Sequence, residues 1–429
     1  MDESRLIFDW NELEPRRRFD PAAVSLFDET LRDGLQNPSV IAPAIEEKLE
    51  ILHAMNDLGI HAADIGLPAS SPRAFDDCLR ICREVERARL PIKVACAGRT
   101  MVGDIMPMIE LSQRAGIPIE VYAFIGSSPI RQYAEDWDVD LIVRRSVEAI
   151  DAAVDAGLEV AYVTEDTTRS RPETLRLLFR EAIEHGASRI CLSDTVGHAT
   201  PDGVQQLVRF TKEVIAETGV PNIGIDWHGH NDRGLALENC VRALDCGVDR
   251  VHATALGIGE RVGNVPMELL LMNMKLLGLL DRDLTPMIDY VETVARAVGW
   301  SIPINYPLVG RDAFRTATGV HAAAIIKAMG KGDSWLADRI YSGVPAGVFG
   351  RSQEICVGAM SGASNVLHWL RKHDIAPSEE LVTEILKIAK TRDHILTDEE
   401  LLAIAGRPER HSRRSLRASR AWQEGRDGR

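Results

Sequence analysis

The sequence predicts a (β/α)8 TIM barrel of the α/β class, followed by a C-terminal, mainly helical appendage. Short β-prone runs alternate with amphipathic helical stretches, and eight such units fit into about 260 residues, the size of this barrel. An open, doubly wound sheet alternates in the same way. Eight is the number of strands that closes a barrel, however, and no dinucleotide-type glycine loop follows the first run. We therefore expect the barrel.

The eight predicted strands follow one another at regular spacing. In chain order they are residues 24–27, 62–65, 92–95, 119–124, 158–163, 189–192, 223–226 and 250–254. A helical pattern covers residues 44–58 and ends at Gly59, where glycine is the expected stop signal. A glycine that can end a helix also stands shortly before later strands, at Gly116, Gly157, Gly186 and Gly247.

The alternation stops after residue 285, and helices and loops follow. The predicted helices are residues 287–298, 319–329, 363–372, 378–389 and 398–405. We therefore divide the chain into an N-terminal extension (1–20), a catalytic barrel (21–285), a helical C-terminal part (286–406) and a basic tail (407–429). The tail carries eight arginines against three acidic residues and is predicted to be disordered.

Composition and charge exclude several classes of protein. The 429 residues are 45% hydrophobic and 27% charged, which is typical of a globular protein, and the net charge is −14. Such an acidic chain has no general attraction for nucleic acids or anionic membranes. The most apolar stretch, residues 267–280, is too short and too interrupted to span a membrane. The beginning of the chain lacks a signal-peptide pattern and the seven cysteines are scattered, so we expect a cytoplasmic protein.

Polar residues gather where the predicted strands end, which is where barrel enzymes place their catalytic groups. They follow seven of the eight runs: residues 28–36 after the first, Asp64 at the second, Arg99 after the third, Glu165 and Asp166 after the fifth, Asp194 and Thr195 after the sixth, residues 228–232 after the seventh, and residues 257–264 after the eighth. The sequence therefore predicts one functional rim.

His228 and His230 are the strongest candidates for metal ligands. Residues i and i+2 of a strand point to the same side, so the two imidazoles can bind one ion. The alternative is two unrelated core histidines. Carboxylates and an amide at neighbouring strand ends would complete a mixed nitrogen and oxygen site, which suits Zn²⁺, Mn²⁺ or Mg²⁺ without choosing among them.

Two further motifs allow more than one interpretation. Arg32 and Asp33 could form a surface ion pair. Alternatively, Asp33 could bind the metal while Arg32 faces an anionic oxygen of the substrate. The glycines of residues 257–264 fit a tight turn better than a phosphate-binding loop, and Glu260 and Arg261 can pair with each other.

Taken together, these motifs resemble those of a known family. Residues 31–36 (LRDGLQ), 228–232 (HGHND) and 257–264 (GIGERVGN) look like the signatures of the barrel metallolyase-type condensing enzymes. These include 2-isopropylmalate, homocitrate and citramalate synthases. The likeness extends from about Asp28 to Tyr341 and includes residues 164–169 (TEDTTR) and 193–197 (SDTVG).

The resemblance implies a metal-dependent acyltransferase of amino-acid biosynthesis. It implies one divalent ion (zinc, manganese or magnesium) held by Asp33, His228, His230 and Asn264. It also implies a 2-oxo acid bound with the help of Gln36 and Thr195, and an oxyanion stabilised by Arg32. Acetyl-CoA is the implied cosubstrate. Its enolate attacks the keto carbon, and hydrolysis of the thioester makes the condensation irreversible.

The base implied by the resemblance lies in the C-terminal part. In the synthases it is a histidine of a Gly-[Ile/Val]-His segment, which is here His321 of residues 319–321. Glu165 would orient His321 and Tyr341 would assist it. The family also implies a homodimer in which the helical part covers a barrel mouth.

Two other functions stay open. An acyl-CoA lyase of the HMG-CoA lyase type shares the barrel and the Arg-Asp-Gly-Leu-Gln pattern, but such lyases place a cysteine in the loop after the last strand, and residues 257–264 contain none. A catalytically inactive metal-binding barrel is the third hypothesis, although all the implied ligands and Arg32 are present. Ala161 stands where homocitrate synthases tend to carry an arginine, so small apolar 2-oxo acids are the expected substrates.

Overall fold

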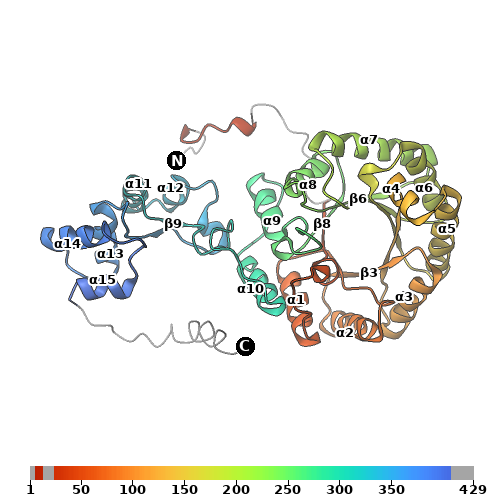
Figure 1. Cartoon of the computed structure of the whole chain (residues 1–429), viewed down its shortest axis with the longest axis horizontal. Helices are drawn as coiled ribbons and strands as arrows, with labels where there is room; N and C mark the ends of the chain where they lie inside the picture. Colours follow the sequence, from red (N-terminus) through yellow and green to blue (C-terminus); the bar gives the residue numbers. More distant parts are fainter. Residues whose placement is uncertain (1–4, 13–23, 407–429) are drawn as a thin grey trace. The chain divides into compact units, whose positions relative to one another are not determined.

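The computed structural model describes residues 5–12 and 24–406 and contains the predicted barrel (Figure 1). Eight parallel strands close on themselves, with β1 hydrogen-bonded to both β2 and β8. The strands are β1 (Ser25–Asp28), β2 (Ala62–Asp64), β3 (Lys93–Arg99), β4 (Glu120–Gly126), β5 (Val160–Glu165), β6 (Arg189–Asp194), β7 (Gly224–Gly229) and β8 (Arg250–Ala253). Each overlaps a predicted run.

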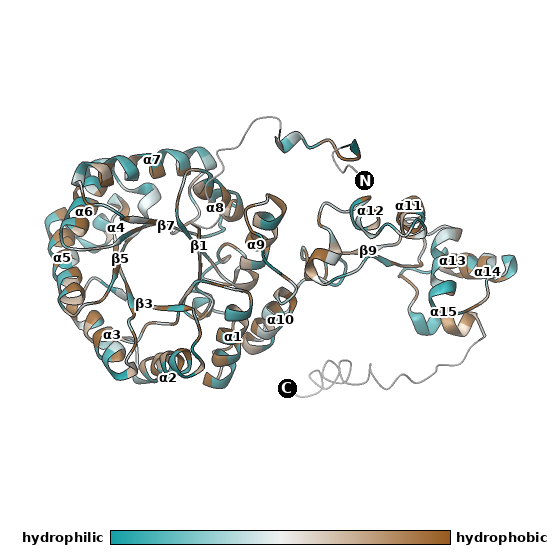
Figure 2. Ribbon diagram, turned by 180° about the vertical axis from the view of Figure 1, so that it is seen from behind, coloured by the Kyte–Doolittle hydropathy of each residue, from teal (hydrophilic) through white to brown (hydrophobic). Residues whose placement is uncertain are grey.

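Helices surround the strands. The principal ones are α1 (Ile45–Asp57), α2 (Pro72–Ala88), α3 (Val102–Ala115), α5 (Val139–Asp155), α6 (Pro172–Glu184), α7 (Pro201–Thr218) and α8 (Ala236–Asp245), with a short α4 (Pro129–Glu135) after β4. Their sequences are amphipathic, and hydrophobic and hydrophilic residues alternate along them in Figure 2. Helix α7 shows the local signals: Thr200 accepts a hydrogen bond from the Gly203 amide, Pro201 begins the helix, and Gly219 ends it with φ of +70°.

Side chains fill the interior of the barrel. Phe27 and Tyr122 stack with their ring centroids 4.7 Å apart, and small residues on neighbouring strands, such as Ala62 and Ala161, make room for them. Below these rings, Arg250 donates hydrogen bonds to Glu120 (2.6 Å) and to the Tyr122 hydroxyl (2.8 Å). The interior is therefore a packed core, as expected of this fold, whose active sites lie at the carboxyl ends of the strands.

The boundary between the two parts of the chain differs from the expected one. The first compact unit extends to Gly310, whereas we expected the barrel to end at residue 285. Helices α9 (Met267–Leu276) and α10 (Met287–Val298) belong to this unit, and α10 packs against α1. The Tyr290 hydroxyl on α10 donates a hydrogen bond to the buried carboxylate of Asp28. The apolar face of α10 is therefore part of the barrel's outer layer.

We predict that Tyr290→Phe destabilises the first unit by about 1–3 kcal/mol, because one oxygen of a buried carboxyl loses a hydrogen-bond donor. Burial already raises the pKa of Asp28 to about 6, so this group is sensitive to the loss of a donor. Urea unfolding followed by circular dichroism measures the effect. Tyr133→Phe is the matched control, because Tyr133 is 86% exposed. Equal midpoints for both variants would contradict the prediction.

The second unit begins at Arg311 and is described to residue 406. It contains a short parallel pair, β9 (Arg315–Thr316) and β10 (Glu354–Ile355), and the helices α11 (Gly319–Gly330), α12 (Ser334–Arg339), α13 (Ala363–Lys372), α14 (Glu379–Ala389) and α15 (Asp398–Ile404). Trp369, Leu370 and Ile385 are central to its core. The predicted tail, residues 407–429, and most of the predicted extension, residues 1–20, lie outside the described residues. In the part of the chain that the structure describes, no helix has the length and apolarity needed to cross a bilayer.

Candidate active site and metal centre

Three of the four predicted metal ligands lie together inside the barrel mouth. Asp33 follows β1, His228 lies on β7, and His230 directly follows β7. One ligand atom from each residue lies within 4.8 Å of the others. The Asp33 Oδ2 atom is 3.5 Å from the Nε2 atom of each histidine. The fold therefore brings these three residues together. This geometry supports the proposal that they are metal ligands.

Asn264, the fourth predicted ligand, reaches the same region through the loop after β8. His230 and Asn264 form an isolated antiparallel β-bridge. The loop folds back on itself, and the backbone N–H of Asn264 donates a hydrogen bond to the backbone carbonyl of Gly257 (2.9 Å). Gly257 and Gly263 have φ of +63° and +86°, a conformation that favours glycine. The glycines of this loop thus make a tight turn that places Asn264 beside His230.

The donor set fits a divalent ion. Among the described residues, the Oδ1 atoms of Asp33 and Asn264 are buried and have no hydrogen-bond partner. Buried oxygens without a donor are unfavourable, and a cation would satisfy both. Burial raises the pKa of Asp33, but Arg32 and the two histidines outweigh it and hold the pKa well below its usual range. The carboxylate is therefore available as a ligand at neutral pH.

Arg32 is held by three carboxylates. Its Nε donates to Asp64 Oδ2 (2.8 Å), its Nη2 to Glu29, and its Nη1 lies 3.3 Å from Asp33. The side chain is only 16% exposed, so the pair with Asp33 is not a surface ion pair. A guanidinium has five N–H donors, which leaves some of them available to a substrate oxygen.

Thr195 directly follows β6, and its hydroxyl group can donate a hydrogen bond to a substrate. Its Oγ1 accepts a hydrogen bond from the Asp166 amide (2.8 Å), so the hydroxyl proton can point elsewhere. Its carbonyl accepts from Arg261 Nη2 (2.6 Å). Arg261 also binds Asp232 (2.9 Å) and lies 3.4 Å from Glu260, so the predicted Glu260–Arg261 contact is the weaker of its two ion pairs.

Gln36 and Glu165 lie at the rim. Gln36 ends a short 3-10 turn after Asp33 and is exposed. Glu165 ends β5 and forms an ion pair with Arg131 (3.2 Å), while burial raises its pKa. The predicted orientation of His321 by Glu165 stays a prediction, because His321 lies in the second unit.

His321 and Tyr341 form one pair within the second unit. Their rings stack with centroids 4.2 Å apart and an interplanar angle of 28°. Both side chains are exposed, Tyr341 by 49%. An imidazole in contact with a phenol and open to solvent can accept a proton from an incoming molecule.

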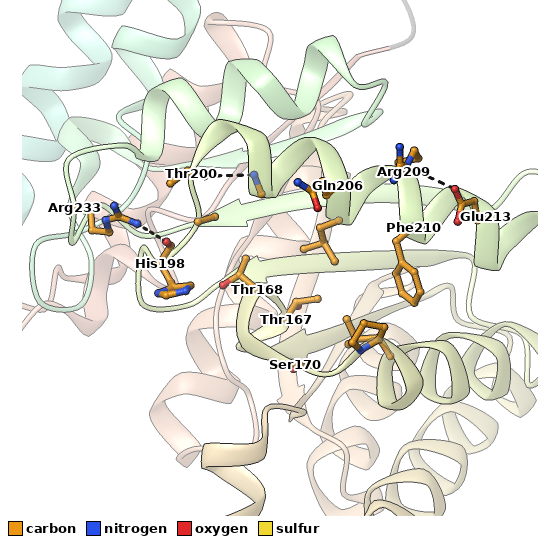
Figure 3. Close-up of a pocket in the computed structure, with 15 residues that line it drawn as sticks. Thr167, Thr168, Ser170, His198, Thr200, Gln206, Arg209, Phe210, Glu213 and Arg233 are labelled. Carbon is orange, nitrogen blue, oxygen red and sulfur yellow. Dashed lines mark hydrogen bonds and ion pairs between the residues drawn. The ribbon is translucent and has the colours of Figure 1, made fainter.

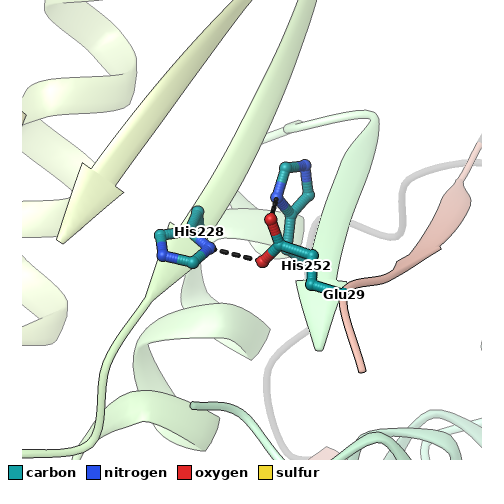
Figure 4. Close-up of side chains that lie close together, drawn as sticks. All are labelled: Glu29, His228 and His252. Carbon is teal, nitrogen blue, oxygen red and sulfur yellow. Dashed lines mark hydrogen bonds and ion pairs between the residues drawn. The ribbon is translucent and has the colours of Figure 1, made fainter. Parts of the chain in front are cut away.

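Sequence reasoning missed the contacts of Glu29 and His252, two buried residues that lie close to His228 (Figure 4). The Nδ1 atom of His228 is 2.6 Å from Glu29 Oε2, and the Nδ1 atom of His252 is 3.3 Å from Glu29 Oε1. Their contact depends on the register of β1 with β8, which no local sequence pattern gives. Phe27 on β1 is paired in register with His252 on β8, and Glu29 lies two residues after Phe27, on the same side.

A separate groove of about 500 Å³ lies between α6 and α7 (Figure 3). Leu175, Leu207 and Phe210 give it an apolar side, and His198 and Arg233 are among its polar residues. None of the residues predicted for the site lines this groove. The groove is therefore distinct from the group of Asp33, His228 and His230.

Comparison with known proteins shows the family of this chain. Residues 23–295 match the model of the HMGL-like family. A homocitrate synthase of Methanopyrus kandleri is 31% identical over 86% of this chain and 88% of its own length. A 2-isopropylmalate synthase of Sediminispirochaeta smaragdinae is 29% identical over 90% of this chain and 75% of its own length.

Solved structures share the barrel. The HMG-CoA lyase of Bacillus subtilis aligns with a TM-score of 0.55 and 21% identity, covering 65% of this chain and 95% of the lyase. An HMG-CoA lyase from Acinetobacter baumannii, solved with coenzyme A and 3-methylmalate, aligns with a TM-score of 0.55 and 19% identity over 67% of this chain and 94% of the lyase. At this identity the likeness concerns the fold alone. The family match and the synthase relatives go further: the chain belongs to the HMGL-like family and is an enzyme of the transferase type.

Proposed function

We propose that this enzyme condenses acetyl-CoA with a 2-oxo acid and hydrolyses the thioester, giving a 2-alkylmalate-type product. The observation that carries the proposal is the buried group of Asp33, His228 and His230 beside Arg32, with two oxygens that have no donor. The synthase relatives support the same reaction class. We propose Asp33, His228, His230 and Asn264 as the residues that would hold the ion.

The chain's own residues would position the 2-oxo acid. When bound, the divalent ion supplies Lewis acidity that makes the keto carbon more electrophilic. The hydroxyl of Thr195 would donate to the substrate carboxylate, and the exposed side chain of Gln36 would help to bind the 2-oxo acid. The remaining N–H donors of Arg32 would stabilise the charge that develops on the keto oxygen, because they are already oriented by Asp64 and Glu29.

We propose His321 as the base, assisted by Tyr341 and oriented by Glu165. His321 would take a proton from the methyl group of acetyl-CoA, and the resulting enolate carbon would form the new bond to the keto carbon. Water would then cleave the thioester and release the thiol of CoA. We propose a homodimer as the working assembly, since the resemblance to the synthases implies one.

We further propose a 2-oxo acid with a small apolar side chain, such as 2-oxoisovalerate or pyruvate. Leu67, Phe124 and Val163 are partly buried and pack on the apolar cluster of the barrel interior. Position 161 in the same cluster is a buried alanine, and its methyl side chain supplies no cation for a second carboxylate. These residues favour an apolar side chain over that of 2-oxoglutarate.

The reaction is tested with metal-loaded protein, acetyl-CoA and a panel of 2-oxo acids, following the release of free thiol. Thiol release that requires a small apolar 2-oxo acid supports the proposal. A parallel assay supplies a hydroxyacyl-CoA. Acetyl-CoA release in that assay alone would identify a lyase, and silence in both assays would identify an inactive metal-binding barrel.

We predict that His230→Ala lowers metal content and activity together, because the proposed site loses one of its ligands. Elemental analysis after dialysis gives the stoichiometry, and thiol release gives the rate. His198→Ala is the control, since His198 is exposed and lines the separate groove. A His230→Ala protein with full metal and full rate would show that the ligand assignment is wrong.

A further inference from the structure

The two ring nitrogens of His228 face two different carboxylates. Nδ1 is 2.6 Å from Glu29 Oε2, and Nε2 is 3.5 Å from Asp33 Oδ2. Figure 4 shows the His228 ring facing Glu29. Glu29 is 2% exposed, so solvent does not compete for this contact. Asp33 belongs to the proposed metal site and Glu29 lies behind the ring. The imidazole therefore has one side toward the ion site and one side toward a buried acceptor.

With an ion bound on the Nε2 side, this arrangement fits one tautomer of the neutral imidazole. A neutral imidazole carries a single N–H, and a carboxylate without a proton can only accept it. With the proton on Nδ1, the lone pair of Nε2 is directed toward the ion site. A hydrogen bond at the second nitrogen is how proteins fix the tautomer and ring orientation of a metal-ligating histidine.

Glu29 is itself held in place. Its Oε1 atom contacts Arg32 and lies 3.3 Å from His252 Nδ1. On its other side, His252 Nε2 is 3.2 Å from Asp226 Oδ2. Asp226 is anchored by hydrogen bonds from Arg189 (2.6 Å) and from the Tyr122 hydroxyl (2.6 Å). Buried contacts thus connect the carboxylate of Glu29 through His252 to Asp226 in the barrel core.

A second ion at Glu29, His228 and His252 is the competing interpretation, because these three groups also lie close together. The contacts argue against it. Arg32 already brings a positive charge to Glu29, and both oxygens of that carboxylate have partners. The other nitrogen of His252, Nε2, already lies 3.2 Å from Asp226 Oδ2. A cation at Glu29 would therefore stand beside the Arg32 guanidinium, among groups that already have partners.

We propose that Glu29 is a positioning residue of the metal site, which orients His228 so that Nε2 is the ligand nitrogen and holds Arg32 beside it. This inference rests on the metal centre of the proposed function. It requires neither acetyl-CoA nor a particular 2-oxo acid, so it can be tested on the metal-binding step alone.

The test compares Glu29→Gln with Glu84→Gln in the full-length chain. Glu84 is a matched control, because it forms a similar contact to a histidine (2.7 Å to His53 Nε2) on the outer helix α2. Competition with a chelator measures Zn²⁺ affinity without substrate. We expect Glu29→Gln to weaken binding by about 10–100-fold and Glu84→Gln to leave it unchanged. Wild-type affinity in Glu29→Gln would overturn this inference alone, whereas a wild-type protein that binds no Zn²⁺, Mn²⁺ or Mg²⁺ would overturn the metal centre as well.

A measurement on the wild type covers the case in which Glu29→Gln fails to fold. In ¹⁵N-histidine-labelled, zinc-loaded protein, long-range ¹H–¹⁵N correlation identifies which His228 nitrogen carries the proton. We expect the proton on Nδ1 and the metal on Nε2. The opposite assignment would overturn the proposal. In a folded Glu29→Gln protein, the His228 signals should no longer show a single tautomer, an effect that a purely structural role of Glu29 would not produce.

Discussion

The His321→Ala variant is expected to bind metal and 2-oxo acid like the wild type, yet to lose about 10²–10⁴-fold in kcat. His321 is exposed and contacts Tyr341, so its removal leaves the core of the second unit intact. The loss should concern proton abstraction. Exchange of the acetyl-CoA methyl protons with deuterated water, followed by mass spectrometry, measures that step directly.

His394→Ala is the matched control for this variant. His394 is another exposed histidine of the second unit, where it contacts Asp393 and Glu400. We expect its proton exchange and kcat to match the wild type. If His321→Ala also exchanges protons at the wild-type rate, His321 is not the base, and the metal site proposed in the barrel is unaffected.

The second large effect is expected at Arg32, where Arg32→Gln should lower kcat by about 10²–10³-fold through loss of oxyanion stabilisation. This change also removes the cation among Glu29, Asp33 and Asp64, so the folded state should lose stability. Arg32→Lys separates the two effects. It keeps the charge but cannot hold two carboxylates and a substrate oxygen in one plane. We expect Arg32→Lys to regain most of the stability and little of the rate.

Arg99→Lys provides the comparison. Arg99 ends β3 at the same rim and forms a bidentate pair with Asp104, but it contacts none of the three carboxylates that hold Arg32. Thermal unfolding and thiol-release kinetics should show only small changes in this variant. An Arg32→Lys protein with wild-type kcat would remove Arg32 from the proposed mechanism.

The barrel could be predicted because its signals are local. Each strand is a short apolar run followed by a turn and an amphipathic helix, and β6 and β8 begin at the predicted residues, Arg189 and Arg250. The helix Met287–Val298 was also predicted with its observed bounds. Its assignment to the first unit was not, because that depends on packing against α1 and on the Tyr290–Asp28 hydrogen bond. Such long-range contacts leave no periodic pattern.

Only part of the candidate site could be read from the sequence, for the same reason. Asp33, His228, His230 and Asn264 stand in motifs that can be read directly from the chain. The contact partners of these motifs are less visible. Glu29 stands next to a recognised motif, but its role arises only when β1 lies beside β8 and faces β7. His252 looks like an ordinary strand residue until its register with Phe27 is known.

Pairing of β1 with β8 also determines when the proposed ligands can meet. Asp33 follows the first strand, whereas His228, His230 and Asn264 come from the seventh strand and the loops that follow it and the eighth. During synthesis on a ribosome, a growing chain would expose only the first of these groups for most of translation. Ion capture would therefore mark a finished domain, and truncated products would lack the means to retain the ion.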